Sequence, residues 1–452
     1  MKNSGFLGDL IASILDRGTI FSSFSDDREI EQLCRELLSS KGEVSSRRIG
    51  SAILNRYQEL DGDGKLGFFH LLNEQMDLDV AAIEKAARAY GEDRNAANLA
   101  ALSDAAEAPR QELLRRLNHV PGATSALVNM RKDLLDLLPT NPELKRMDLD
   151  FTHLFVSWFN RGFLVIRPIS WQSPANILAK IIQYEAVHAI KDWDDLRRRL
   201  QPDDRRCFAF FHPSMPVEPL VFVEVALCRG VPKSVQNVLR DERSELDSSD
   251  VDTAVFYSIS NCQEGLRGIS FGNFLIKQVV ADLSVELPQL KTFVTLSPLP
   301  GLTEWLKSEN SPVSQDFIDE LDKLGSGESL DGKGDVLRSL AAQYLVQTKR
   351  DDGLPLDPVA RFHLSNGASV HDLHALADIS TNGLKNSFGV MVNYLYDIPK
   401  VESQHEAFAQ NGEVIASKTV SQLAHAKIPA PLRRSAVVTE PSRKKLHDQS
   451  PV

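Results

Sequence analysis

The fold is decided by the stretch Tyr257-Ser-Ile-Ser-Asn-Cys-Gln-Glu-Gly-Leu-Arg-Gly-Ile-Ser-Phe-Gly-Asn-Phe-Leu-Ile276. Its apolar start, spaced glycines and amphipathic end predict a strand, a turn and a helix. Gly265, Gly268 and Gly272 let the backbone approach a ligand closely, and the first helical turn offers unpaired N–H groups and a positive dipole end. The stretch therefore predicts a cradle for a pyrophosphate. The plainer alternative, glycines that only sharpen a strand-to-helix turn, is the commoner case.

The bulk composition of the 452-residue chain is that of a globular protein with two or three domains. Its net charge of -11 disfavours a general nucleic-acid or membrane-surface binder, because such proteins carry a broad basic field. The four cysteines form no C-x-x-C pair, which favours reduced thiols and gives no zinc site. No run approaches the ~20 apolar residues that span a bilayer, and the N-terminus lacks a secretory or transit pattern. We therefore expect a cytoplasmic protein that binds neither nucleic acid nor membrane.

Hydrophobic periodicity divides the chain near residue 160. Before that point apolar residues recur at spacings of three and four, as in Leu113, Leu114 and Leu117, which predicts a helical domain over residues 1–160. Beyond it, short β-branched runs alternate with helical patterns and predict an α/β or α+β domain over residues 161–426. The proline- and charge-rich residues 427–452 predict a disordered tail.

The second domain contains separate strand and helix patterns. Strands are expected over Gly162–Ile166, Glu218–Leu227, Thr253–Ile259, Lys291–Leu296 and Phe388–Tyr396. Helices are expected over Asn176–Ala189, Asp192–Leu200, Asn273–Glu286 and Asp335–Val346.

Two residues of this domain are candidates for chemistry. Ser297 follows a predicted strand at an exit stiffened by Pro298 and Pro300, and His363 lies further along the same domain. The two side chains could form an acid–base or hydrogen-bonding pair around a ligand. A Ser–His hydrolase is one interpretation, but no Gly-x-Ser-x-Gly elbow occurs in the chain. A strand-end serine that only caps a turn is the alternative.

Other polar residues give weaker signals. His371 and His374, with Asp378 close in sequence, match no zinc spacing, and we expect them to be surface or core residues. Among the basic residues, Arg267 is the preferred phosphate contact because it lies within the glycine turn itself.

The segment Arg267-Gly-Ile-Ser-Phe-Gly-Asn-Phe-Leu-Ile276 resembles the acyl-CoA loop of GNAT-type acetyltransferases, with Ser270 in place of one glycine. Over most of its length the chain is similar to the malonyl-CoA decarboxylase family. The matching pieces are Phe159…Gly162-Phe-Leu, Trp171…Ser173-Pro174, Glu185-Ala-Val-His188, Lys191…Trp193, Glu218-Pro-Leu-Val, Phe256-Tyr-Ser-Ile-Ser260, Gly265-Leu-Arg-Gly268, Phe274-Leu-Ile-Lys277, Leu296-Ser-Pro-Leu-Pro-Gly301, Trp305-Leu306 and Phe362-His-Leu-Ser-Asn-Gly-Ala368. So many matches in order are more specific than any single motif.

This resemblance implies a two-domain α+β fold: an N-terminal helical bundle used for oligomerisation and a C-terminal GNAT-like mixed-sheet catalytic domain. It implies that malonyl-CoA is converted to acetyl-CoA and carbon dioxide with no metal and no organic cofactor. A homotetramer is implied as well, with a place in fatty acid metabolism or malonate breakdown.

Site residues follow from the same resemblance, position by position. Ser297 and His363 match the family's catalytic pair, and Ser258 and Tyr396 match active-site supports. The residues that match its CoA-binding segment are Arg267, Gly268, Ile269, Ser270, Phe271, Gly272 and Asn273. Mammalian members have a glutamate where this chain has Ser270, so no carboxylate is assumed there.

The reaction sets the chemical demands. Loss of carbon dioxide leaves an enolate on the thioester, so negative charge must be stabilised and a proton delivered to carbon. We expect His363 to be the proton donor or the proton-bearing hydrogen-bond partner, and Ser297 to orient the carboxylate or relay the proton. A GNAT-type N-acyltransferase and a non-catalytic acyl-CoA sensor are the alternatives. The Ser297–His363 pair disfavours the sensor, and Ser270 disfavours a standard acetyltransferase loop.

Overall fold

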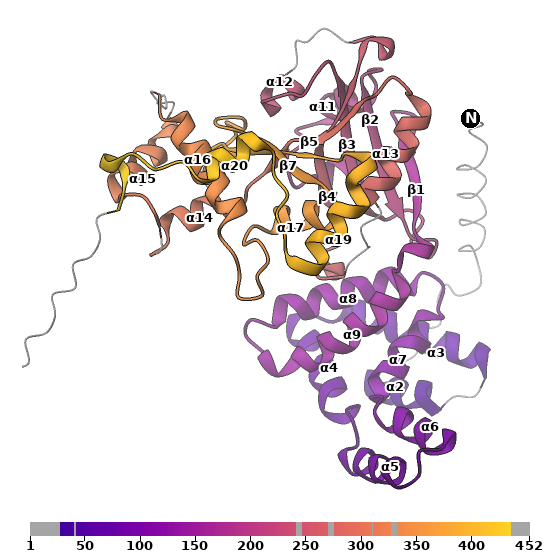
Figure 1. Ribbon diagram of the computed structural model, residues 1–452. Helices are drawn as coiled ribbons and strands as arrows, with labels where there is room; N and C mark the ends of the chain where they lie inside the picture. The colour runs from indigo at the N-terminus through magenta and orange to yellow at the C-terminus, as the bar shows by residue number, and fades with distance from the viewer. Residues whose placement is uncertain are drawn as a thin grey trace, which may run out of the picture. The chain divides into compact units, whose positions relative to one another are not determined.

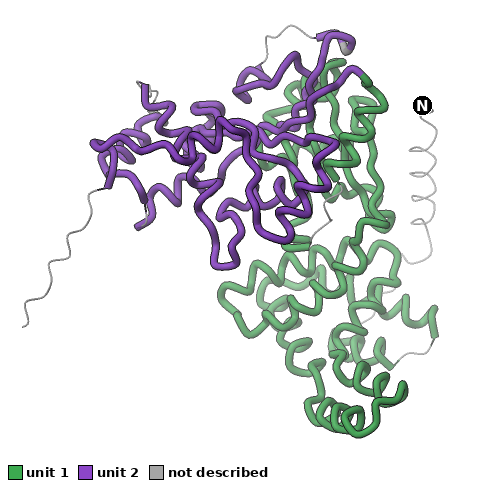
Figure 2. The backbone as a smooth tube through the Cα atoms, in the orientation of Figure 1, with its two compact units in different colours: residues 1–225, 258–288 green, residues 226–257, 289–452 purple. Residues whose placement is uncertain are grey.

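The computed structural model describes residues 28–39, 42–240, 246–269, 275–309, 311–326 and 332–434. The chain forms two compact units, shown in Figure 2: unit 1 comprises residues 1–225 and 258–288, and unit 2 comprises residues 226–257 and 289–452. The predicted domain limits at 160 and 426 stay predictions. The described chain continues to Arg434 and includes a short 3₁₀ turn at Ala430–Leu432, whereas the rest of the predicted tail lies outside the described residues.

The first part of unit 1 is helical, as predicted (Figure 1). Its helices are α2 (Ile30–Ser39), α3 (Glu43–Glu59), α4 (Gly62–Gln75), α5 (Val80–Glu92), α6 (Ala96–Ala105), α7 (Pro109–Asn118), α8 (Ala123–Leu137) and α9 (Lys145–Trp158). Leu113, Leu114 and Leu117 are buried in one apolar cluster with Phe151 and Phe155. The three-and-four spacing therefore marks the buried faces of these helices.

A mixed sheet follows, and strands β3 and β4 contribute to both units. Unit 1 has the strand order β1 (Val165–Ile169), β2 (Arg205–Phe211), β3 (Pro219–Cys228) and β4 (Thr253–Asn261). In unit 2 the order is β3, β4, β5 (Thr292–Thr295), β8 (Met391–Leu395) and β6 (Ser297–Pro298), and β7 (Ser369–His374) also pairs with β8. Strand β5 is parallel to β4 and antiparallel to β8, so the sheet is mixed and the predicted fold class is confirmed.

Helices accompany the strands in both units. Unit 1 contains α10 (Ala175–Tyr184), α11 (Trp193–Leu200) and α13 (Leu275–Glu286). Unit 2 contains α12 (Val235–Leu239), α14 (Leu302–Lys307), α15 (Gln315–Asp322), α16 (Gly334–Val346), α17 (Pro358–Ser365), α18 (Thr381–Ser387), α19 (Val401–Asn411) and α20 (Lys418–Ala424). In unit 1, Ile177 and Ile181 of α10 pack with Ala209 and Phe222 of the strands, which anchors that helix on the sheet.

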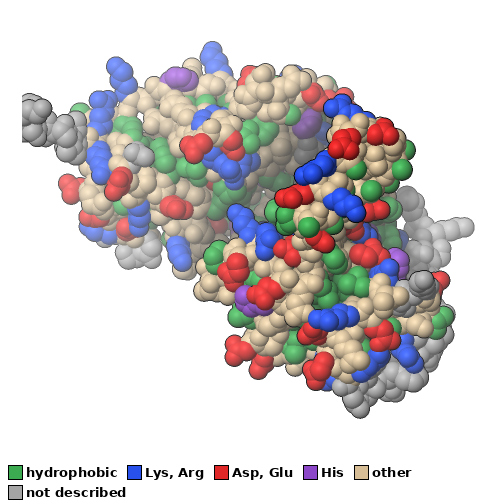
Figure 3. All heavy atoms as spheres, turned by 90° about the horizontal axis from the view of Figure 1, so that it is seen from below, with side chains coloured by type: hydrophobic (Ala, Val, Ile, Leu, Met, Phe, Trp, Pro, Cys, Tyr) green, Lys and Arg blue, Asp and Glu red, His purple; other side chains and the backbone are tan. Residues whose placement is uncertain are grey.

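Element boundaries differ from the sequence predictions by a few residues. Strand β1 begins at Val165 because Arg161–Phe163 form a 3₁₀ turn, and β8 begins at Met391 rather than Phe388. Phe388 ends α18 in a left-handed conformation with φ 49°, so it cannot belong to the strand. None of the helices in the described ranges combines the length and apolar character that crossing a membrane requires. On the face shown in Figure 3, acidic and basic side chains are interspersed.

Candidate active site

Ser297 and His363 lie in direct contact although 66 positions separate them in the sequence. Ser297 Oγ is 3.0 Å from His363 Nε2, and both side chains are buried, with 5% and 2% exposure. Both belong to unit 2. The structure therefore brings together the pair that the sequence singled out.

Strand pairing positions Ser297. It forms the short strand β6 with Pro298, and β6 pairs with β8 so that Ser297 lies opposite Val392. Pro298 and Pro300, which follow Ser297, limit the backbone of this exit. Ser297 is thereby held by the sheet rather than by a mobile loop.

A capped helix positions His363. The residue lies in the last turn of α17, which begins at Pro358 after the N-cap Asp357. One oxygen of the buried Asp357 carboxylate accepts from Ala360 N at 2.8 Å, and the other accepts from Tyr344 Oη at 3.3 Å. The backbone N–H of Gly301 also bonds to Asp357. One carboxylate thus joins the helix of His363 to the exit that follows Ser297.

The surroundings of His363 keep the pair uncharged. Its Nδ1 atom lies 2.9 Å from Tyr396 Oη, and the ring stacks on Tyr394 at 4.4 Å between centroids. Burial lowers the pKa of His363 from 6.5 to about 3, so the imidazole is neutral near pH 7. Burial also raises the pKa of Tyr396 well above its ordinary value. The cluster therefore exchanges hydrogen bonds between neutral groups.

Thr295 completes this cluster, and sequence reasoning missed it. Its Oγ1 accepts a hydrogen bond from Ser297 Oγ at 2.9 Å and another from Tyr394 N at 3.2 Å. In the sequence Thr295 is an ordinary β-branched residue of a strand. The available signal was its spacing of two from Ser297, because residues i and i+2 of an extended chain share a face.

Ser258 lies in a different network, within unit 1. Its Oγ is 2.8 Å from each carboxylate oxygen of Glu185, and Ser260 Oγ donates to the same carboxylate at 3.2 Å. The backbone N–H groups of Val187 and His188 donate to Glu185 as well. The role of Ser258 as an active-site support stays a prediction.

A second carboxylate extends that network. Glu224 is fully buried and accepts from Arg199 Nη1 at 3.2 Å, while Arg199 also contacts Asp195. Burial, together with the nearby charge of Glu185, raises the pKa of Glu224 to about 8. Burial likewise raises the pKa of Glu185 despite its hydrogen bonds.

Only part of the glycine turn lies within the described residues. Ser270, Phe271, Gly272 and Asn273 lie outside the described residues, together with the adjoining Phe274. Gly268 has φ 82° and open space around its Cα, as a backbone-lined ligand site requires. Ile269 is buried in the apolar cluster of the N-terminal helices, and Arg267 is exposed.

Gly265 has a different explanation from the one predicted. A Cβ added there would lie 1.9 Å from the carbonyl oxygen of Val128 in α8, so the glycine permits close packing against that helix. Arg131 of α8 strengthens the contact by donating to the carbonyl oxygens of Gly265 at 2.8 Å and Arg267 at 2.9 Å. The expectation that Gly265 serves a ligand is therefore corrected: it serves helix packing.

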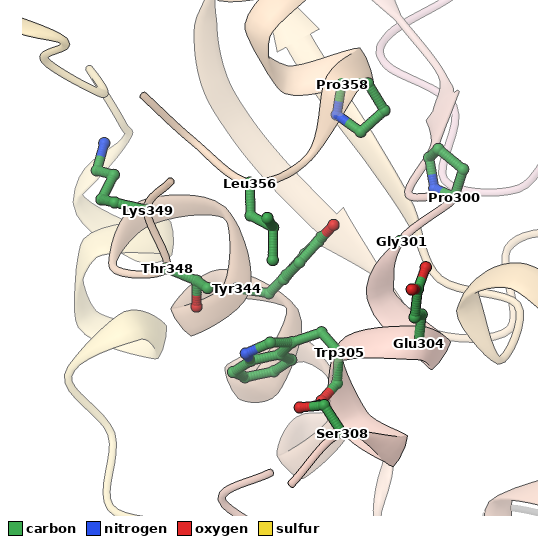
Figure 4. Close-up of a pocket in the computed structure, with 10 residues that line it drawn as sticks. All are labelled: Pro300, Gly301, Glu304, Trp305, Ser308, Tyr344, Thr348, Lys349, Leu356 and Pro358. Atoms are coloured by element: carbon green, nitrogen blue, oxygen red, sulfur yellow. The ribbon is translucent and has the colours of Figure 1, made fainter. Parts of the chain in front are cut away.

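A cavity of about 630 Å³ opens in unit 2, shown in Figure 4. Its lining residues are Pro300, Gly301, Glu304, Trp305, Ser308, Tyr344, Thr348, Lys349, Leu356 and Pro358. The hydroxyl end of Tyr344 is directed toward Gly301, where an added Cβ would lie 2.2 Å from the phenolic oxygen. Gly301 and Pro358 connect this cavity to the segments of Ser297 and His363, but neither of those two side chains lines it.

The remaining histidine candidates form no metal site in the described chain. His374 is 8% exposed, and its Nε2 lies 2.6 Å from Asn393 Oδ1, so it is a core histidine with a partner, as expected. Among the described residues no group of three or more His, Cys, Asp and Glu side chains could hold a metal ion. A helical region and a mixed sheet with a buried, uncharged Ser–His pair together define the class of this protein as an α+β fold with a candidate active site.

Comparison with known proteins gives the family. The profile of the malonyl-CoA decarboxylase C-terminal domain matches residues 162–435, and that of the N-terminal domain matches residues 77–159. The chain belongs to the malonyl-CoA decarboxylase family, whose members are carboxy-lyases.

Curated relatives and solved structures agree. The mitochondrial malonyl-CoA decarboxylase of Anser anser anser is 36% identical over 343 residues, 68% of each chain. The enzyme of the same name from Mus musculus is 35% identical over 347 residues, 69% of this chain and 70% of the relative. The crystal structure of malonyl-CoA decarboxylase from Agrobacterium vitis is 49% identical with a TM-score of 0.82, covering 88% of this chain and 99% of that one. The structure from Rhodopseudomonas palustris is 48% identical with a TM-score of 0.81, covering 87% and 98%.

Proposed function

We propose that this carboxy-lyase converts malonyl-CoA to acetyl-CoA and carbon dioxide with Ser297 and His363 as its proton-transfer pair. The family assignment supports the overall reaction. The observation that supports the residue assignment is the 3.0 Å contact between Ser297 Oγ and His363 Nε2 in a buried cluster of neutral groups.

The chemistry fits neutral hydrogen-bond donors. Breaking the bond between the carboxylate carbon and the α-carbon leaves an electron pair that spreads onto the thioester oxygen as an enolate. The α-carbon then takes a proton, and water restores that proton to the protein after product release. A hydroxyl and an imidazole N–H can stabilise the enolate and supply the proton, and burial strengthens both effects because little water competes.

The glycine turn is the proposed holder of the coenzyme. Arg267 and the segment through Asn273 would bind the CoA pyrophosphate through backbone N–H groups and one guanidinium. The positive φ and open surroundings of Gly268 support this assignment. Malonyl-CoA and a proton from water are then the only reactants, and no metal or organic cofactor enters the proposal.

The test is incubation of purified protein with malonyl-CoA alone. We expect carbon dioxide and acetyl-CoA in equal amounts, with no amine present. Folded protein that releases no carbon dioxide would contradict the proposal. Transfer of an acetyl group from acetyl-CoA to an added amine, without decarboxylation, would instead support a GNAT-type N-acyltransferase.

The assembly and cellular location complete the proposal. A homotetramer built through both domains and a cytoplasmic location follow from the family resemblance and the sequence. Light scattering on the purified protein tests the first, and a mass other than four chains would contradict it. Fractionation of the source cells tests the second.

A further inference from the structure

Thr295 is hydrogen-bonded to Ser297 of the proposed catalytic pair. We propose that Thr295 is a positioning residue that accepts the Ser297 hydroxyl proton and thereby holds His363 in the tautomer with hydrogen on Nε2. This inference rests on the proposed function and deepens it, because it identifies His363 as the hydrogen donor to Ser297.

The argument begins with the single hydrogen of Ser297. Its hydroxyl donates to Thr295 Oγ1 at 2.9 Å. Because a serine hydroxyl has only one hydrogen to donate, the 3.0 Å contact between Ser297 Oγ and His363 Nε2 must take its hydrogen from the imidazole. Nε2 therefore carries the hydrogen and Ser297 accepts it.

The contact of the other ring nitrogen, Nδ1, is consistent with this direction. A neutral imidazole has one N–H donor and one acceptor nitrogen. With hydrogen on Nε2, Nδ1 must accept, and Tyr396 Oη lies 2.9 Å away with a phenolic hydrogen to donate. The chain of donors thus runs from Tyr396 to His363, from His363 to Ser297, and from Ser297 to Thr295.

Thr295 is held firmly enough to impose this order. Its side chain is fully buried, its Oγ1 also accepts from Tyr394 N at 3.2 Å, and its carbonyl oxygen accepts from Asn393 Nδ2 at 2.7 Å. Its backbone pairs with Phe256 in the β4–β5 register. A β-branched side chain fixed at so many points presents its oxygen in one place.

The direction has a chemical consequence. A serine nucleophile donates its hydrogen to an unprotonated Nε2, as in Ser–His hydrolases. Here the order is reversed, which suits proton delivery. When the substrate is bound, the Ser297 hydrogen turns from Thr295 to the α-carbon, and Ser297 recovers a hydrogen from Nε2. The electron pair that the departing carbon dioxide leaves on the α-carbon forms the new C–H bond. Tyr396 keeps its hydrogen and donates it in the hydrogen bond to Nδ1, which stabilises the negative charge on the imidazole. Water returns a proton to Nε2 after product release, so the pair regains its starting tautomer.

The tautomer is measurable in the free enzyme. In the full-length protein with ¹⁵N-labelled histidine, the His363 signals are assigned by their loss in His363→Gln. We expect the wild-type spectrum to show Nε2 protonated and Nδ1 unprotonated. Hydrogen on Nδ1 in the wild type overturns the proposal. This measurement needs no turnover, so it is independent of the proposed function, which fails separately if malonyl-CoA is not decarboxylated.

Variants test the role of Thr295 itself. Thr295→Val keeps the shape and removes the acceptor, so we expect hydrogen to appear on Nδ1 and kcat to fall by about tenfold with KM little changed, whereas Thr295→Ser should restore both. Thr292→Val, in the same strand, is the matched control and should leave the His363 spectrum and kcat as in the wild type. A wild-type tautomer with wild-type kcat in Thr295→Val would overturn the proposal. If Thr295→Val does not fold, Thr295→Ala and the wild-type spectrum carry the same test.

Discussion

Ser258 and Ser297 are both buried serines at strands of the sheet, yet they form hydrogen bonds with chemically different partners. Ser258 bonds to a carboxylate that two backbone N–H groups and Ser260 also approach. Ser297 bonds to a neutral imidazole and a threonine hydroxyl. A carboxylate bound by so many donors keeps its partners in place, whereas a row of neutral hydroxyl and N–H groups can pass a hydrogen along it. The difference separates a network built around a carboxylate from a network of neutral groups that suits the proposed chemistry.

Replacing the catalytic pair should have the largest effect. Ser297→Ala and His363→Ala should each lower turnover of malonyl-CoA by about a hundredfold or more, roughly 2.7 kcal/mol of transition-state stabilisation, because each removes a proton-transfer group. Carbon dioxide release measures the rate. Ser417→Ala removes the N-cap serine of α20 in the same unit and is the matched control, with wild-type turnover expected. A near-normal rate in either pair variant would remove that residue from the mechanism.

Removing Ser258 should act mainly on stability. Ser258→Ala deletes a donor that lies 2.8 Å from both oxygens of the buried Glu185, so about 1–3 kcal/mol of unfolding free energy should be lost. Urea unfolding followed by circular dichroism measures the change. A loss no larger than that of an exposed control in the same unit, such as Ser157→Ala, would show that the carboxylate does not depend on this serine.

The two networks also show how far the sequence could predict the site. Ser297 and His363 were found because their residue types, and the prolines that follow Ser297, are local signals. Periodicity predicted several strands and helices, but strands β2 and β7 were not predicted. Thr295 was missed because its role depends on the direction of one O–H bond. Glu185 and Ser258 are 73 positions apart, and the reason for Gly265 lies in α8, so neither could be read from nearby residues.

The pH dependence of stability should distinguish the networks by sign. The pKa of His363 falls from 6.5 in the unfolded chain to about 3 in the fold, so between these values the unfolded chain binds more protons. Stability from this group is fully present above pH 6.5 and is lost as the pH falls toward 3, by up to about 1.4 kcal/mol per pH unit. In urea unfolding from pH 7 to 5, the stability of the wild type should fall relative to that of His363→Gln as the pH decreases. Parallel curves would mean that the pKa of His363 is not lowered in the folded protein.

Glu224 should give a slope of the opposite sign. Its pKa rises from 4.5 to about 8, so the folded chain keeps a proton that the unfolded chain loses, and stability falls as the pH rises between these values. Arg199 contacts the same carboxylate and favours its ionised form, which keeps the pKa from rising further, but between these two values the slope approaches ~1.4 kcal/mol per pH unit. Glu224→Gln keeps the shape without the titration, so its unfolding free energy should change less than that of the wild type between pH 6.5 and 8.

The two groups can also be tested together. Between pH 4.5 and 6.5 His363 makes stability rise with pH and Glu224 makes it fall, so the two effects oppose each other. His363→Gln removes the first effect, and its stability should fall as the pH rises through this interval. If the stability of His363→Gln instead rises with pH across that interval, Glu224 is ionised in the fold. The contrast between a carboxylate network that holds a proton and a histidine network that excludes one would then be lost.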